Sequence, residues 1–267
     1  MINRRSLLVA GGVAALSTLT ALPAFADTYD DIMKAKKLKV ALDLAIPPSG
    51  MMDANMKPTG SDVETAQLLA KDWGVELEMV QTTGPTRIPN LLTNKADVII
   101  STLSITPDRQ KVIDFSRPYA AQLTVVGAPK ASPIKDWPDV RGKSISVTRG
   151  TIQDSMLTPL AAERGFTVVR YDDDATLVTA AVSGQAQMVC TSSTIVRQMA
   201  ERNQTLDFEP KITIASTDLA VGIRKGDTNL MNHVNEWVVA NLRNGKLGAI
   251  YKKYHGVDIP ASLIPKD

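Results

Sequence analysis

The densest group of side chains suited to holding an anion lies in residues 100–119, ISTLSITPDRQKVIDFSRPY. The β-branched run at residues 98–100 follows a polar stretch and predicts a short buried strand. Small hydroxyl residues, among them Thr102 and Ser104, stand where that strand should end. Hydroxyls and backbone amides at the end of a strand can donate hydrogen bonds to a negatively charged ligand.

A short helix that carries an arginine is predicted to follow these hydroxyl residues. Pro107 suits the first turn of a helix, because proline lacks the backbone donor that this position leaves unused. Arg109 would then lie one turn inside the helix, where its planar fork of donors could match a carboxylate. Taken alone, these residues also fit a simpler interpretation, in which Thr106 caps the helix and Arg109 is a solvated surface charge.

The order of residues in this segment resembles that of periplasmic solute-binding proteins that deliver amino acids to ATP-binding-cassette importers. In that family, hydroxyl residues are followed by Ile-Thr-x-x-Arg and then by Asp-Phe-Ser-x-Pro-Tyr. Residues 105–109 and 114–119 match both motifs almost letter for letter. The resemblance is looser elsewhere but extends over nearly all of the chain after the leader. A Gly-Lys-x-Ile-x-Val-x-x-Gly-Thr pattern of the family, for example, fits residues 142–151.

The resemblance implies a set of ligand-binding residues. Arg109 takes the place of the residue that holds the ligand carboxylate, and Ser104 would present its backbone amide to the same group. Thr102 takes the place of a hydroxyl that commonly contacts the amino end. Thr151 would add an amide from the second lobe, since Gly150 before a helix lets the backbone approach an anion. Without the resemblance, Gly150 and Thr151 equally fit a turn followed by a helix cap.

Several positions depart from the family's pattern. An aspartate that usually pairs with the ligand ammonium falls on Ser192, and a neutral serine would leave a buried ammonium without its counter-charge. Two aromatic positions that commonly stack on the ligand are Ile46 and Ser61, and a third aromatic is replaced by Ser49. We therefore expect a pocket that is wider and less aromatic than is usual in the family.

Two explanations of Ser192 stay open on the sequence. Either the ligand has no α-ammonium group, or another acid supplies the charge. Asp43, at the end of the first predicted strand, is the better placed candidate, and Asp218 near the second crossover is a weaker one. The run Asp172-Asp173-Asp174 is expected to cap the helix that follows it.

Strands and helices alternate along the chain, which predicts an α/β protein. Strand-like runs at 38–42, 75–80 and 98–101 alternate with helices, the first of which is expected to end at Gly74. The pattern begins again after a Pro-rich connector at 128–133, with a strand expected at 167–171, a helix at 193–202 and a strand at 219–223. Such units call for mostly parallel sheets flanked by helices. The resemblance implies a two-lobed periplasmic-binding-protein fold joined by a two-strand hinge. In this division 27–123 plus 218–267 form lobe 1, and 124–217 form lobe 2.

The sequence also predicts export. Residues 1–26 combine a basic start at Arg4 and Arg5, an uncharged apolar run and a small-x-small site before Asp27, which predicts a cleaved signal peptide and a periplasmic protein. The arginine pair also resembles a twin-arginine signal. Removing Arg4 and Arg5 reduces 30 basic residues to 28, against 28 acidic ones. This balance gives no indication of a nucleic-acid partner.

The expected function is that of a non-catalytic binding protein. A single cysteine, Cys190, excludes an internal disulfide, and two separated histidines do not suggest a metal site, so no cofactor is expected. The protein would capture an amino acid or related carboxylate-bearing solute between its lobes and, as a monomer, deliver it to a membrane permease. The alternative is an exported enzyme resembling the cyclohexadienyl dehydratases, which act on prephenate or arogenate. That chemistry needs a positioned general acid, and Ser192 and Ser193 offer none.

Overall fold

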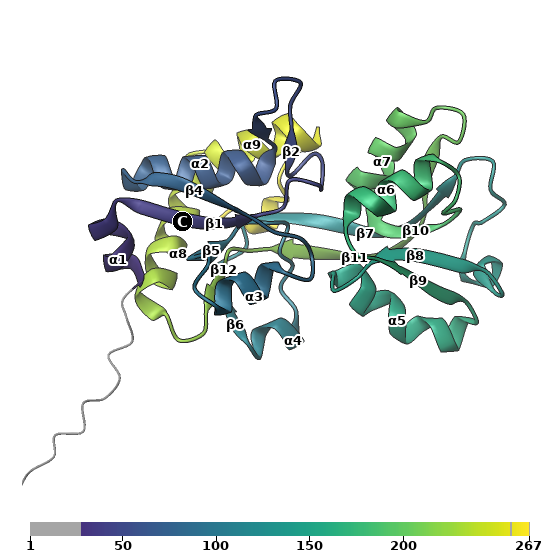
Figure 1. Ribbon diagram of the computed structural model, residues 1–267, viewed down its shortest axis with the longest axis horizontal. Helices are drawn as coiled ribbons and strands as arrows, with labels where there is room; N and C mark the ends of the chain where they lie inside the picture. The colour runs from purple at the N-terminus through teal and green to yellow at the C-terminus, as the bar shows by residue number, and fades with distance from the viewer. Residues whose placement is uncertain (1–27, 257, 267) are drawn as a thin grey trace, which may run out of the picture.

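The structure is a computed structural model and describes residues 28–256 and 258–266. Two lobes lie side by side along the long axis of the molecule, each with helices packed on a five-stranded sheet (Figure 1). The predicted signal peptide lies outside the described residues. Among the helices of the described part, none is long and apolar enough to cross a membrane. The two-lobed α/β fold expected from the sequence is confirmed.

The first lobe holds a sheet in which four of the five strands run in the same direction. Its strands, in spatial order, are β4 (Glu76–Gln81), β1 (Lys37–Leu42), β5 (Val98–Ile99), β12 (Gly222–Arg224) and β6 (Ile113–Phe115). β1 pairs in parallel with β4 and β5, while β12 alone runs antiparallel to its neighbours. The helices of this lobe are α1 (Thr28–Ala35), α2 (Ser61–Trp73), α3 (Arg87–Leu92), α4 (Pro107–Gln110), α8 (Thr228–Arg243) and α9 (Lys246–His255). A hairpin of β2 (Met51–Met52) and β3 (Pro58–Thr59) and a 3-10 turn at Ala261–Leu263 complete it.

Helix α2 illustrates how local sequence builds this lobe. Its buried residues Val63, Ala66, Leu69 and Ala70 recur at helical spacing and form one apolar face, which packs into the core of the lobe. Gly74 adopts a left-handed conformation with φ of 65° and ends the helix, as glycine does most easily. The helix predicted to end at this glycine is confirmed.

The second lobe has a sheet of the same kind. Its strands, in spatial order, are β11 (Phe208–Leu219), β7 (Ala120–Pro129), β10 (Val189–Ser192), β8 (Ser144–Thr148) and β9 (Thr167–Tyr171). Only β7 runs opposite to the other four strands, because it is antiparallel to both β10 and β11. The helices of this lobe are α5 (Ile152–Arg164), α6 (Asp174–Val182) and α7 (Ser193–Arg202), with a 3-10 turn at Trp137–Val140.

Two long antiparallel strands, β7 and β11, connect the lobes (Figure 1). The sequence pattern did not predict either as a full strand, since the connector expected at 128–133 begins inside β7 and the strand expected at 219–223 is divided between β11 and β12. Pro210 stands at a register shift of β11, which lies at the edge of its sheet, where a missing backbone donor is tolerated. The expected lobe boundaries at 123/124 and 217/218 fall inside these two strands, and the boundaries themselves stay a proposal.

Candidate ligand-binding site

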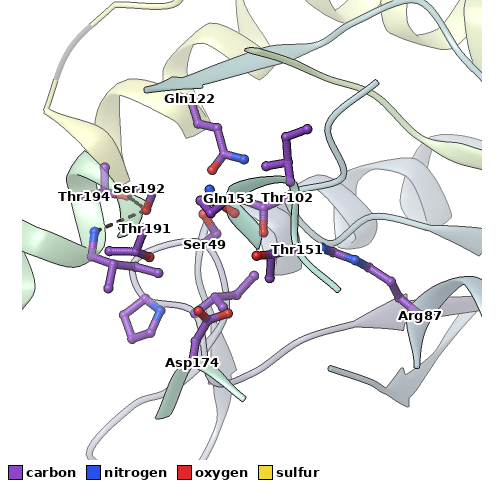
Figure 2. A pocket seen from close by; sticks show the side chains of 14 residues that line it. Ser49, Arg87, Thr102, Gln122, Thr151, Gln153, Asp174, Thr191, Ser192 and Thr194 are labelled. Atoms are coloured by element: carbon purple, nitrogen blue, oxygen red, sulfur yellow. Dashed lines mark hydrogen bonds between the residues drawn. The ribbon is translucent and has the colours of Figure 1, made fainter. Parts of the chain in front are cut away.

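A small cavity of about 30 Å³ lies between the two lobes and is walled by residues from both (Figure 2). These residues stand mostly at or shortly after the carboxyl ends of strands, where open α/β sheets bind their ligands. The wall consists of Ile46, Pro47, Ser49, Arg87 and Thr102 from the first lobe, Gln122 from β7, and Thr151, Ile152, Gln153, Asp174, Thr191, Ser192, Thr194 and Ile195 from the second lobe.

The lobes touch beside this cavity, so the cleft is closed in this structure. Arg109 donates a hydrogen bond from Nη2 to the carbonyl oxygen of Gly150 at 3.4 Å, which joins α4 to the turn before α5. A Cβ placed on Gly84 would lie 3.1 Å from Cγ2 of Thr151 and 3.3 Å from the backbone oxygen of Arg149, so segments of the two lobes approach closely there. Ile46 of the first lobe is buried in an apolar cluster of the second.

Arg109 is a buried cation and not a solvated surface charge. Its residue surface is 8% exposed, and Nη1 donates to the backbone oxygen of Ser104 at 2.9 Å. Burial, and after it the nearby Arg87, lower the pKa of Arg109 to about 9, so the guanidinium stays charged at neutral pH. Among the described residues, no carboxylate oxygen lies within 4.0 Å of a guanidinium nitrogen of Arg109, so it forms no ion pair there. The predicted cap is present as well, since Oγ1 of Thr106 accepts from the backbone N–H of Arg109 at 3.2 Å.

The two hydroxyl residues ahead of this helix lie in different places. Thr102 lines the cavity in a left-handed backbone conformation with φ of 43°, and its N–H donates to Asp62 at 2.7 Å. Ser104 is fully buried beside the connecting strands and does not line the cavity. Its Oγ accepts from Nε2 of Gln122 at 3.0 Å and contacts Oγ1 of Thr217 at 3.3 Å.

Gly150 and Thr151 form both the turn and the helix cap that their residue types predict. Gly150 has φ of 70°, and Oγ1 of Thr151 accepts from the N–H of Asp154 at 3.2 Å. The same Oγ1 donates to the backbone oxygen of Thr148 at 2.7 Å. This cap nevertheless places Thr151 on the cavity wall, opposite the first lobe.

The positions that depart from the family's pattern meet different surroundings. Ser192 lines the cavity at the start of α7, where its Oγ accepts from the N–H of Ile195 at 3.3 Å. Ile46 and Ser49 also line the cavity. Ser61 does not, because it lies behind the wall with its Oγ 3.0 Å from Nε2 of His255. Ser61 is therefore outside the cavity in which it was expected.

The two acids considered as replacements for the missing aspartate do not line the cavity. Asp43 is 3% exposed, and its Oδ1 accepts from the N–H of Ala45 at 2.9 Å. Burial raises the pKa of Asp43, while this hydrogen bond lowers it by less. Asp218 is exposed on β11 and stands away from the cavity wall.

Asp174 is the acid that reaches the cavity, and the sequence pattern missed it. The helix cap expected of the run at 172–174 is provided by Asp173, whose Oδ1 accepts from the N–H of Thr176 at 2.7 Å. Asp174 is 8% exposed, lines the cavity and accepts from Oγ1 of Thr148 at 2.6 Å. Burial raises the pKa of Asp174 to about 6, although the bond from Thr148 and the positive charge of Arg87 act in the opposite direction.

Arg87 is a buried cation that lines the cavity, and the sequence pattern missed it; Arg109 lies at the lobe contact beside the cavity and does not line it. Arg87 is 5% exposed, and its guanidinium points into the cavity (Figure 2). Nη1 donates to the backbone oxygen of Ser101 at 2.5 Å, while Nε has no hydrogen-bond partner in the described structure. Burial lowers the pKa of Arg87, and the charges of Asp43, Asp174 and Asp62 raise it. An arginine that opens the mostly apolar helix RIPNLL was the available sequence signal.

The different roles of two adjacent acids lead to a prediction. Replacing Asp173 by alanine should lower the free energy of unfolding by about 1 kcal/mol, because the N-cap acceptor of α6 is lost. Ligand affinity should stay unchanged, since Asp173 does not line the cavity. Urea unfolding and calorimetry would measure both quantities. A loss of affinity as large as that of an Asp174 variant would contradict this separation of roles.

Comparison with known proteins gives one family. Residues 38–257 match the family described as bacterial extracellular solute-binding proteins, family 3. The chain is 27% identical over 263 residues to the L-cystine-binding protein TcyJ of Escherichia coli (strain K12), with 97% of both chains covered. The crystal structure of a mutant of ArgBP from T. maritima superposes on this chain with a TM-score of 0.77 and 30% sequence identity. The superposition covers 86% of this chain and 100% of the ArgBP chain. The ancestral amino acid-binding protein AncCDT-1, a precursor of cyclohexadienyl dehydratase, has a TM-score of 0.76 and 32% sequence identity to this chain. The match covers 85% of this chain and 99% of AncCDT-1.

The family match and the geometry agree. The match spans most of the chain and includes both five-stranded sheets and the two strands that connect them. The buried arginine of the Ile-Thr-x-x-Arg motif lies at the contact between the lobes, beside a cavity at the ends of their strands. On these grounds the chain belongs to family 3 of the bacterial extracellular solute-binding proteins.

Proposed function

We propose that this protein is the non-catalytic, periplasmic binding component of an ATP-binding-cassette importer, and that it holds an amino acid or related carboxylate between its lobes. The observation that carries the proposal is Arg109, a buried cation at the lobe contact without an acidic partner among the described residues. An unpaired buried charge is costly, and a ligand carboxylate would offset that cost. The ligand would thereby favour the closed form, because it binds the closed form more tightly than the open one.

Residues of both lobes would share the ligand. Thr102 and Thr151 face the cavity from opposite lobes. Thr102 offers its hydroxyl, because its N–H already donates to Asp62, and Thr151 offers its backbone amide, because its hydroxyl already donates to Thr148. Ser104 and Gly150 would act through Arg109, whose guanidinium their carbonyl oxygens hold at 2.9 and 3.4 Å. Ser192 would contribute a hydroxyl, and no charge, to the same wall.

The charges at the site favour a ligand that carries an ammonium group as well. Asp174 lines the cavity, so it can take the role of the aspartate that Ser192 replaces. The two buried arginines, Arg87 and Arg109, are balanced by Asp43 and Asp174 when both acids are ionised and the third buried acid, Asp62, whose pKa is raised by burial to about 7, is protonated. A zwitterion would preserve this balance, whereas a simple anion would leave an extra negative charge in a closed, desolvated space. We therefore propose a zwitterionic amino acid, which is the second of the two explanations for Ser192.

Calorimetry and thermal shift on the mature protein would test this function, after unfolding and refolding to remove co-purified ligand. The panel contains the common amino acids, opine-like and betaine-like compounds, and carboxylates without an amine. We expect at least one compound with a primary amine to bind at about micromolar Kd or tighter and to raise Tm. If only amine-free or tertiary-amine carboxylates bind, the role of Asp174 is wrong. If no carboxylate binds, the role of Arg109 is wrong.

The proposed partner is a membrane permease that receives the ligand from the closed form. We propose that the protein acts as a monomer, because the faces of the cleft must separate and close in each cycle. Size-exclusion chromatography with light scattering, with and without ligand, would test this state. A stable dimer that persists with ligand would argue against it.

A dehydratase-like enzyme is the second candidate, and one observation favours it. Asp174 is a buried carboxyl in the cavity whose pKa is raised to about 6, a value suited to a general acid near neutral pH. Incubation with prephenate or arogenate, followed by chromatography of the products, separates the two functions. A binding protein should return the substrate unchanged, whereas turnover that Asp174→Asn abolishes would establish the enzyme.

A further inference from the structure

A larger chamber adjoins the ligand cavity on the side of the connecting strands. It has a volume of about 540 Å³, compared with about 30 Å³ for the cavity. A buried water needs about 10–15 Å³ of cavity volume, so the cavity has room for only a few waters. The chamber has room for a sizeable chemical group. Four residues line both spaces, Ser49, Thr102, Gln122 and Thr194, so the two spaces meet at these side chains.

The junction between the two spaces lies opposite the acid of the cavity. In Figure 2, Gln122 and Thr194 lie on the far side of the cavity from Asp174. Ser49 lines both spaces, and its small side chain leaves this passage open. A ligand whose ammonium group pairs with Asp174 would therefore point its distal end toward the chamber.

The chamber lies between α7 of the second lobe and α9 of the first, which stand on the same side of the molecule (Figure 1). Its wall includes apolar side chains such as Leu123, Phe208 and Pro260, which suit the hydrocarbon part of a ligand. Leu123 is 44% exposed, so this part of the wall is accessible to solvent.

Arg197 is the charged group that a ligand in the chamber would meet. It is exposed on α7, and its Nη2 donates to the backbone oxygen of His255 at 3.2 Å, across the lobes. The acids of the chamber already have partners: Glu209 pairs with Lys211 at 2.6 Å and Asp258 with Lys252 at 2.9 Å. Within the described residues, no acid lies within ion-pair distance of Arg197, so the chamber presents a positive charge.

We infer that the ligand is an elongated amino acid derivative. Its amino acid head lies in the cavity, its chain passes Ser49 and Thr194, and its distal end carries a carboxylate that meets Arg197 in the chamber. This inference rests on the proposed function, because the head group uses the same Arg109 and Asp174. An amino acid with a short side chain would fill the cavity and leave the chamber to solvent.

Three probes with the same head group test the inference by calorimetry on the mature protein: L-norleucine, Nε-acetyl-L-lysine and Nε-succinyl-L-lysine. The first is short, the second is long and neutral, and the third is long with a terminal carboxylate. We expect the succinyl compound to bind at least about tenfold more tightly than norleucine, as a new charge-assisted hydrogen bond allows, with the acetyl compound between them.

Two variants examine the chamber directly. Arg197→Met should remove the advantage of the succinyl over the acetyl compound, while Arg202→Met, an exposed arginine of the same helix outside the chamber, should preserve it. Leu123→Trp narrows the chamber from the exposed side of β7 and should reduce the preference for both long probes over norleucine.

The remaining outcomes contradict the inference in distinguishable ways. Equal weakening of all three probes by Arg197→Met would mean that this arginine only joins the lobes. If a common amino acid binds and the long probes do not, the chamber is not part of the site, although the proposed function stands. If no amino acid or carboxylate binds at all, the proposed function fails and this inference fails with it.

Discussion

Replacing Arg109 by methionine is expected to weaken ligand binding by roughly 100- to 1,000-fold in Kd, or about 3–4 kcal/mol. Methionine retains most of the side-chain volume and removes the charge and the donors that hold the carbonyl oxygens of Ser104 and Gly150. A ligand carboxylate would then be buried without a counter-charge. Because one of these bonds joins the two lobes, the variant should also close less readily around any ligand.

A matched control comes from the same segment of the chain. Arg117 is exposed beyond the helix that carries Arg109, and Arg117→Met should leave ligand affinity unchanged within about twofold. Calorimetry on both variants gives the affinities, and circular dichroism verifies that each is folded. Binding by Arg109→Met that equals that of Arg117→Met would exclude Arg109 as the carboxylate site.

Regular elements were predicted well where local pattern and tertiary structure agree. Helix α7 and strand β9 have the predicted bounds, 193–202 and 167–171. Helix α7 has a clear amphipathic period, and β9 is a short β-branched run that comes shortly after a glycine and ends before three aspartates. The connecting strands β7 and β11 were missed because prolines interrupt their pattern. Those prolines are accommodated at a strand end and at an edge-strand register shift, and only the pairing of the two strands shows this.

Site residues, like the regular elements, could be proposed from the sequence only where a local pattern specifies them. Arg109 could be proposed as a site residue from the sequence because it belongs to a contiguous motif whose spacing carries the information. Asp174 could not, because three successive aspartates all fit a helix cap, and only the packing against Thr148 decides which of them points into the cavity. Arg87 was missed for a related reason, since its burial depends on segments of both lobes that are distant in sequence.

Replacing Asp174 by asparagine should weaken the binding of a zwitterionic amino acid by roughly 10- to 100-fold, because the ligand ammonium loses its negative partner. Asparagine keeps the size of the side chain and an oxygen that can accept from Oγ1 of Thr148, so the fold should persist. The deamino analogue of the same amino acid has no ammonium group. Its affinity should be unchanged or improved by the substitution, and calorimetry with this ligand pair measures the difference. Asp172→Asn is the matched control, because Asp172 is exposed and its ion pair within the described residues is with Arg149 on the surface.

The pH dependence of binding identifies the same group in the wild-type protein. Burial raises the pKa of Asp174 to about 6 in the ligand-free protein, so the carboxylate is ionised above this pH and protonated below it. Since the ammonium pairs only with the ionised form, affinity should be constant above pH 7 and fall as pH drops through 6, by at most about tenfold per pH unit. The Asp174→Asn variant should lack this decline. A decline that persists in the variant would assign the titration to another buried acid, such as Asp62, whose pKa is raised by burial to about 7, and would remove Asp174 from the ammonium site.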